Sequence, residues 1–162
     1  LLQGLETSAL DHVYHQRLKL NPGGEQMLAG LKSRDIKIAL VSGGFTFFTK
    51  RLQQRYSLDY TLANKLDINN DQLTGRIVGN IVGAEAKADL LQDICNELNI
   101  HPSQTVAVGD GANDLLMMSQ AGLSIAYHAK PKVQEKAATV INYCGLEGIL
   151  GLLQIDRSNT KS

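Results

Sequence analysis

Short apolar segments that alternate with amphipathic helical patterns place the strongest constraint on how this chain folds. Such segments cover residues 36–41, 105–108, 123–127 and 140–143. Each is too short for a helix and most are rich in β-branched residues, so we interpret them as buried strands. The intervening segments carry apolar residues at helical spacing, most clearly residues 85–99. This alternation predicts an α/β fold, with a parallel sheet covered by helices on both faces.

Two regions depart from the alternation. Residues 6–17 have a helical pattern that ends before Pro22, because proline disfavours helix at the residue that precedes it. Residues 60–68 and 73–81 predict two strands, joined by a tight turn at residues 69–71. The predicted divisions are an N-terminal helical segment (1–21), a core (22–155) with a β-hairpin insertion (60–82), and a flexible polar tail (156–162).

Composition excludes several classes of partner. Sixteen basic residues balance 16 acidic ones, so the net charge gives no reason to expect binding to nucleic acid or to an anionic membrane. No apolar run approaches the roughly 20 residues that a membrane span needs, and there is no signal-peptide pattern. Cys95 and Cys144 belong to no metal-binding motif and fit reduced thiols. We therefore predict a cytoplasmic protein.

The first loop of chemical interest is Ser42-Gly43-Gly44, between a predicted strand and a predicted helix. Two glycines allow a sharp turn that presents several backbone N–H groups, and the serine adds a hydroxyl. Together with the positive end of the following helix, these groups favour binding of an anion such as phosphate. The alternative is that Ser42 caps the helix and the glycines only permit the turn.

The second loop is the acidic turn Gly109-Asp110-Gly111-Ala112-Asn113-Asp114. Asp110 ends a predicted strand and Asp114 begins a helix, so a bend at the glycines brings both carboxylates together. Oxygen ligands without histidine or cysteine favour Mg²⁺ over zinc. The alternative is that Asp114 caps the helix while Asp110 stays in solvent. Two carboxylates are few for a magnesium site that also holds a substrate, so we expect at least one further acid.

Lys87 is the third candidate, in the first turn of the helix predicted over residues 85–99. The helix dipole opposes a cation there, and a residue that breaks a local rule is often retained for function. We interpret Lys87 as a phosphate ligand whose loss should barely change thermal stability. The alternative is an ordinary surface lysine.

In order and spacing, residues 42–45, Lys87 and residues 109–114 resemble the last three signature motifs of the haloacid dehalogenase superfamily. Residues 73–75 and 126–131 make the chain more similar still to the phosphoserine phosphatases of that superfamily. The superfamily's first motif, Asp-x-Asp-x-Thr/Ser, is absent from this sequence, as is most of the helical cap. The resemblance implies a Rossmann-like core whose central first strand is missing from this chain. It also implies that residues 1–21 are the C-terminal end of the cap.

For function, the resemblance implies Mg²⁺-dependent hydrolysis of O-phosphoserine. The absent first aspartate would attack phosphorus and form an aspartyl-phosphate, and the second would protonate the leaving serine oxygen and then activate water. Asp114 would hold either the water shell of the metal or Lys87. The implied phosphate ligands are Ser42, Gly43, Gly44, Lys87 and Asn113, the implied metal ligands are Asp110 and Asp114, and the implied catalytic groups are Lys87 and Asp114.

Two alternatives stay open at this point. The substrate is another small phosphomonoester, such as a phosphosugar or phosphothreonine, or the chain is a non-catalytic fragment that binds an ion or another chain. Without the nucleophile we expect no activity from this chain alone. We further expect the missing strand to come from an N-terminal segment of the same protein or from a neighbouring chain. It would lie between the strands that end at Ser42 and Asp110, which should therefore not pair directly.

Overall fold

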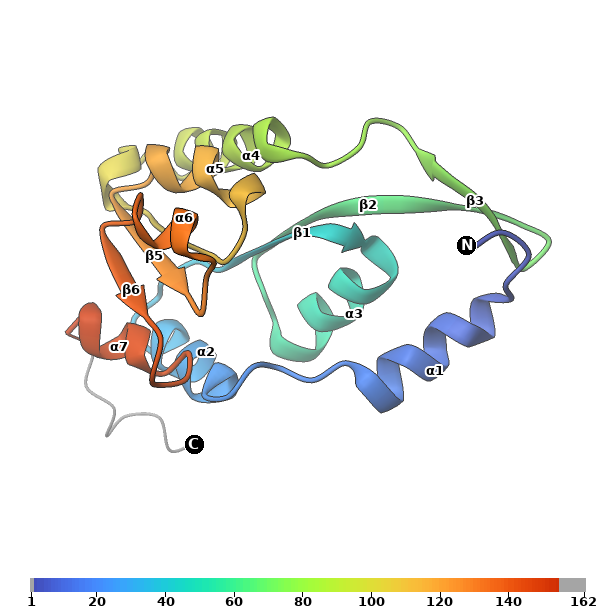
Figure 1. Ribbon diagram of the computed structural model, residues 1–162, viewed down its shortest axis with the longest axis horizontal. Helices are drawn as coiled ribbons and strands as arrows, with labels where there is room; N and C mark the ends of the chain where they lie inside the picture. Colours follow the sequence, from blue (N-terminus) through green and yellow to red (C-terminus); the bar gives the residue numbers. More distant parts are fainter. Residues whose placement is uncertain (1, 155–162) are drawn as a thin grey trace.

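A computed structural model describes residues 2–154, so the predicted tail at 156–162 lies outside the described residues. The helices are α1 (Thr7–Arg17), α2 (Gly24–Lys32), α3 (Thr46–Tyr56), α4 (Ala84–Leu98), α5 (Leu115–Gln120), α6 (Pro131–Gln134) and α7 (Gly148–Leu152). The strands are β1 (Ala39–Phe45), β2 (Tyr60–Asn69), β3 (Gln72–Val78), β4 (Val106–Gly109), β5 (Leu123–Tyr127) and β6 (Thr139–Ile141), and they form two sheets (Figure 1).

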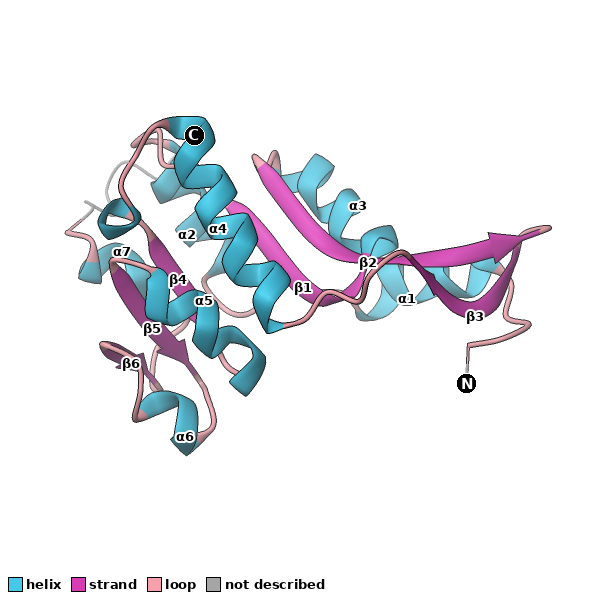
Figure 2. Cartoon of the chain, turned by 90° about the horizontal axis from the view of Figure 1, so that it is seen from above, coloured by secondary structure: helices cyan, strands magenta, loops and turns pink. Residues whose placement is uncertain are grey.

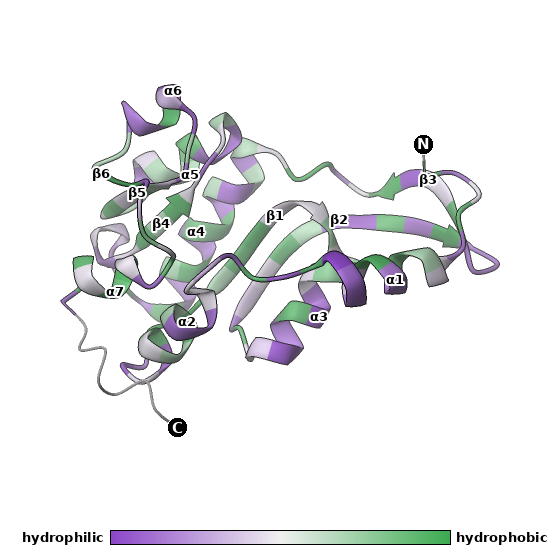
Figure 3. Ribbon diagram, turned by 60° about the horizontal axis from the view of Figure 1, so that its bottom comes forward, coloured by the Kyte–Doolittle hydropathy of each residue, from purple (hydrophilic) through white to green (hydrophobic). Residues whose placement is uncertain are grey.

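The parallel sheet β4–β5–β6 has helices on both faces, as the sequence predicts. Successive side chains of a strand point to opposite faces. Ile125 packs with Ile149 of α7 on one face, whereas Ala126 belongs to the cluster of Leu91 from α4 and Met117 from α5 on the other. The strands β4 and β5 are accordingly mainly green in Figure 3, while α3 mixes green and purple residues. The central apolar strand is thus buried by helices from two directions.

The second sheet changes from parallel to antiparallel pairing along β2. Its first residues pair in parallel with β1, in the register Ala39 with Tyr60, and its later residues pair antiparallel with β3. The resulting hairpin extends away from the rest of the molecule (Figure 2). The buried side chains of Leu10, Leu66 and Leu73 hold α1 against this hairpin. The first residues of the segment predicted as an insertion therefore belong to the same layer as β1.

Strands β1 and β4 do not pair with each other in the described part of the chain, as we predicted. Each has a strand neighbour on one side only, and a cleft of ≈ 780 Å³ runs past Leu40 of β1 and Val108 of β4. Helices connect the two sheets instead. Val41 packs against the cluster that contains Leu91 of α4, and Ile38 packs against Leu31 of α2.

One predicted strand was misplaced. The strand expected at residues 36–41 runs from Ala39 to Phe45 and includes the glycine loop that we predicted as a turn. Ile38, just before the strand, bonds to the segment at the start of β2: its backbone N–H donates to the Asp59 carboxylate, and its carbonyl oxygen accepts from the backbone N–H groups of Asp59 and Tyr60. The register with β2 shifts between Val41 and Phe45, so the loop forms an irregular strand end.

No helix within residues 2–154 is long and apolar enough to cross a membrane. The cytoplasmic location stays a prediction from the sequence. The sequence pattern over residues 132–138 also predicts a helix, but the helix found there, α6, ends at Gln134. The other predicted helices and strands occur, with their ends shifted by a few residues.

Candidate active site

The Ser42 loop lies at the end of β1, with Ser42 half-buried and Gly43 exposed. The backbone N–H of Gly44 donates to Ser42 Oγ over 2.9 Å. Within the described residues the Ser42 hydroxyl accepts this bond but donates none, so its hydrogen is available to an anion. Ser42 is not a helix cap, since α3 begins at Thr46 and no side chain caps it. The capping alternative for Ser42 is therefore wrong.

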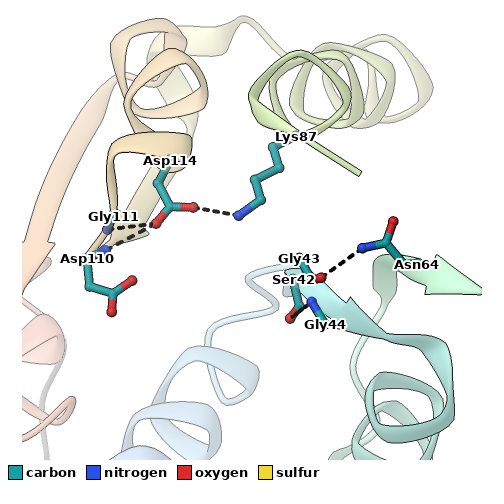
Figure 4. Close-up of polar contacts among 8 residues, drawn as sticks. All are labelled: Ser42, Gly43, Gly44, Asn64, Lys87, Asp110, Gly111 and Asp114. Carbon is teal, nitrogen blue, oxygen red and sulfur yellow. Dashed lines mark hydrogen bonds and ion pairs between the residues drawn. The ribbon is translucent and has the colours of Figure 1, made fainter. Parts of the chain in front are cut away.

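Asp114 is buried, and both of its carboxylate oxygens are engaged (Figure 4). Oδ1 accepts from Lys87 Nζ at 2.8 Å, and Oδ2 accepts from the backbone N–H groups of Asp110 and Gly111 at 3.2 and 3.1 Å. Its side chain does not cap α5. It fixes the turn and the lysine instead, so of the two roles implied by the resemblance the geometry favours holding Lys87.

Lys87 is the fourth residue of α4, and its side chain is buried rather than on the surface. Relative exposure is 4% for the Lys87 side chain and 11% for its partner Asp114. The surface alternative is therefore wrong. An ammonium group has three N–H donors, and Asp114 is its one hydrogen-bond partner within the described residues. Its other donors are available to a bound phosphate.

Asp110 contrasts with Asp114, since it is exposed and its carboxylate has no ion-pair or hydrogen-bond partner within residues 2–154. In Figure 4 the Asp110 carboxylate and the Lys87 ammonium border the space that faces the Ser42 loop. Asn113 bridges the same space: its Nδ2 atom lies 4.0 Å from where a Cβ on Gly43 would be. The fold therefore brings together the groups that the sequence singled out.

The residues present fit part of a magnesium site. No group of three or more His, Cys, Asp or Glu residues that could hold a metal occurs among residues 2–154. The exposed Asp110 carboxylate offers free oxygen ligands, however, and Mg²⁺ is commonly held by one or two carboxylates together with water and substrate phosphate. The need for a further acid stays a prediction.

Asn64 is a buried polar residue of this region that the sequence analysis did not single out. It lies on β2, where its side chain donates to the Gly43 carbonyl oxygen and accepts from the backbone N–H of Val82. The available signal was an amide at an inward position of a strand, where a polar group needs a partner. Identifying that partner required the fold.

Comparisons with known proteins agree with this fold and site. Residues 2–119 match the family model of haloacid dehalogenase-like hydrolases, which is most of the chain. The chain therefore belongs to the haloacid dehalogenase-like hydrolase family.

Within that family the chain is similar to phosphoserine phosphatases. It is 47% identical to the phosphoserine phosphatase of Polaromonas sp. over 95% of this chain and 67% of that protein. A crystal structure of a probable phosphoserine phosphatase from Vibrio cholerae superposes with a TM-score of 0.90 at 42% identity, covering 94% of this chain and 47% of that one. A structure of a phospho-aspartyl intermediate analogue of phosphoserine phosphatase gives 0.88 at 36% identity, covering 93% and 72%. The chain thus spans about half of the Vibrio cholerae protein and about two thirds or more of the other two.

Proposed function

We propose that this chain forms the phosphate- and metal-binding part of a phosphoserine phosphatase, which hydrolyses O-phosphoserine to serine and phosphate. The observation that carries this proposal is the convergence of the Ser42 hydroxyl, the Lys87 ammonium and the free Asp110 carboxylate on one space. An anion-binding loop, a buried cation and an oxygen ligand for a metal are what phosphoryl transfer requires. The similarity to phosphoserine phosphatases supports the choice of substrate.

Each residue of this chain has a defined task in the proposed reaction. The Ser42 hydroxyl, the glycine backbone beside it and the Lys87 ammonium hold the phosphoryl oxygens and offset the charge that develops on them. Asn113 reaches the phosphate or the substrate beside Gly43. Asp110 binds Mg²⁺, which stabilises phosphoryl charge when bound. Asp114 acts indirectly, because it holds Lys87 in place through the contact described above.

The nucleophile in this proposal is an aspartate outside the sequence, because this chain contains no Asp-x-Asp pair. Its carboxylate oxygen bonds to phosphorus as the bond from phosphorus to the serine oxygen breaks. A second aspartate gives its proton to that oxygen, then takes a proton from the water that hydrolyses the aspartyl-phosphate. A similar solved structure is described as a phospho-aspartyl intermediate analogue, which supports this route.

We further propose that the nucleophile arrives on a strand that fills the cleft between β1 and β4. Within residues 2–154 both strands present an unpaired edge, which leaves backbone N–H and C=O groups without strand partners. The cleft is lined by Leu40 and Val108 and reaches Asp110. Since β1 and β4 both lead to the site at their C-terminal ends, a parallel strand between them would deliver its own C-terminal residues there. The proposed occupant is an N-terminal segment of the same protein.

Reconstitution tests both parts of the proposal. Purified chain should be inactive towards phosphoserine, and added N-terminal segment containing the Asp-x-Asp pair should restore Mg²⁺-dependent release of phosphate. The matched control is the same segment with its first aspartate changed to asparagine, which should bind without restoring activity. Hydrolysis of phosphoserine by the chain alone would refute the assignment of the nucleophile. Faster hydrolysis of another phosphomonoester by the reconstituted enzyme would refute the substrate, and dimerisation of the chain alone through the cleft would refute the proposed occupant.

A further inference from the structure

The Asn64 side chain makes two strong contacts from a fully enclosed position. Its exposed fraction is 4%, and it lies on β2 opposite the irregular end of β1, in register with Phe45. The amide nitrogen Nδ2 donates to the Gly43 carbonyl oxygen at 2.8 Å, and the amide oxygen Oδ1 accepts from the Val82 backbone N–H at 2.7 Å. A single buried carboxamide therefore joins two segments that are far apart in the sequence.

The first contact fixes one peptide group of the Ser42 loop. The carbonyl of Gly43 and the N–H of Gly44 belong to the same planar peptide unit. Asn64 holds the carbonyl end, and Ser42 Oγ holds the N–H end at 2.9 Å (Figure 4). Rotation of this peptide would break both bonds, and the Ser42 oxygen would lose the contact that fixes its position. The orientation of the Ser42 hydroxyl thus depends on Asn64.

The second contact fixes the start of the helix that carries Lys87. Val82 immediately precedes Gly83, the residue at the N-cap of α4, and the Gly83 carbonyl oxygen accepts from the Lys87 backbone N–H at 3.2 Å. We propose that Asn64 is a positioning residue. It holds the Ser42 loop and the first turn of α4 at one fixed separation, so that both bind the same phosphoryl group. This inference rests on the proposed function and adds a residue to it.

The carboxamide at this position satisfies both partners. It must donate to Gly43 and accept from Val82, and Asn64 has the two functions on one short side chain. In Asn64→Asp, an ionised carboxylate still accepts from the Val82 N–H. Its second oxygen cannot donate to the Gly43 carbonyl oxygen and repels it instead. In Asn64→Leu, both backbone groups lose their partner and stay buried. The two variants therefore separate the loop contact from the helix contact.

The test is steady-state kinetics of the active enzyme, reconstituted from this chain and the segment that carries the nucleophile. Asn64→Asp should lower kcat/KM for phosphoserine by roughly 10- to 100-fold, with most of the loss in kcat, because small misplacement of a catalytic group costs this much. It should lower kcat/KM for para-nitrophenyl phosphate by the same factor, because Asn64 acts on the phosphoryl end that the two substrates share. Asn64→Leu should lose at least as much.

A matched control distinguishes positioning from general loss of stability. Leu73→Ala removes buried packing between α1 and the hairpin, in a cluster that Phe45 borders but that contains no residue of Ser42-Gly43-Gly44 or of α4. It should lower the melting temperature, yet retain kcat below that temperature. If Leu73→Ala loses kcat as Asn64→Asp does, or if Asn64→Asp stays within twofold of wild type, the inference is wrong. Wild-type enzyme that hydrolyses para-nitrophenyl phosphate but not phosphoserine would overturn the proposed substrate alone, and Asn64 would still be tested.

A second measurement uses this chain alone. Titration of ¹⁵N-labelled chain with inorganic phosphate should shift the amide signals of Gly43, Gly44 and Lys87 together. In Asn64→Asp the Gly43 and Gly44 shifts should be lost, while the Val82 amide keeps its hydrogen-bonded position because the carboxylate still accepts from it. Phosphate shifts of wild-type size at Gly43 and Gly44 in the variant would contradict a positioning role.

Discussion

Asp110 and Asp114 lie in the same turn, yet their surroundings are opposite. Asp114 is buried, with one oxygen on Lys87 and the other on two backbone N–H groups. Asp110 is exposed and, among the described residues, its carboxylate contacts no donor. Of two identical side chains, Asp114 therefore stabilises the site, and Asp110 is free to contact a ligand.

The contrast follows from what burial does to a charge. A buried carboxylate is tolerated only when it is paired and hydrogen-bonded, so all of its binding capacity is used within the protein. Asp114 meets that condition, and in doing so holds Lys87 towards the site. An exposed carboxylate costs little to keep and retains free lone pairs, which suits Asp110 to a metal. Four predictions test this division.

The largest expected effect is on activity, from Asp110→Asn. The change keeps the shape of the side chain but removes the charge proposed to bind Mg²⁺. We expect kcat of the reconstituted enzyme to fall by roughly 100- to 1000-fold, the range seen when a group that stabilises transition-state charge is removed. The melting temperature should change little, because the carboxylate makes no contact within the described residues. Wild-type turnover by this variant would contradict the assignment of Asp110.

The second prediction concerns stability, through Lys87→Met. The sequence led us to expect little thermal effect, but the buried ion pair with Asp114 reverses that expectation. Methionine would leave a buried carboxylate without its cation, and breaking such a pair costs about 3–5 kcal/mol. Chemical denaturation measures the loss. Lys50→Met, at an exposed lysine on α3, is the matched control and should change the unfolding free energy by less than about 0.5 kcal/mol. An equally stable Lys87→Met would refute the importance of the pair.

Local patterns predicted most of this fold because each depends on nearby residues. The helix over 85–99 and the strand over 123–127 are both present, since an apolar stripe at helical spacing or a short, mainly apolar segment indicates the element from neighbouring residues alone. The register of β1 was not predictable in this way. Whether Ser42 to Phe45 turns or continues as a strand depends on pairing with β2, which begins at Tyr60.

The candidate site shows the same limit. Motif residues such as Ser42, Lys87 and Asp110 were predicted from their positions at a strand end or a helix start and from the resemblance to the haloacid dehalogenase motifs. Their partners were predicted only in part, since holding Lys87 was one of the two roles implied for Asp114. The burial of Lys87, the choice of Asp114 as its partner and the two contacts of Asn64 depend on how α4, β2 and the acidic turn meet in space. Residue patterns do not show which distant segments of the chain contact each other in the fold.

The third prediction tests how tightly the turn is packed around Asp114. A Cβ added at Gly109 would lie 2.5 Å from Asp114 Cβ, so Gly109→Ala must displace the aspartate. We expect a loss of about 1–3 kcal/mol, typical of overpacking, together with weaker phosphate binding because Lys87 loses its fixed partner. Gly83→Ala is the matched control, since a Cβ there meets nothing within 4 Å. Unfolding by urea compares the two. Equal stability of both variants would mean that the turn adjusts freely.

The smallest expected effect is that of Mg²⁺ on this chain alone. Asp110 is the one carboxylate of the site with free oxygens among the described residues, so we expect weak binding that stabilises the fold only slightly. At a Mg²⁺ concentration equal to the dissociation constant, the gain would be about 0.4 kcal/mol. Isothermal calorimetry and thermal denaturation measure the binding and the gain. Asp110→Asn should abolish both, whereas Asp93→Asn, at an exposed position on α4, should keep them. Calcium should replace Mg²⁺ poorly, because it requires more ligands at longer distances. If Mg²⁺ binding survives Asp110→Asn, the metal binds elsewhere. The exposed Asp110 would then not be the metal ligand that distinguishes it from Asp114.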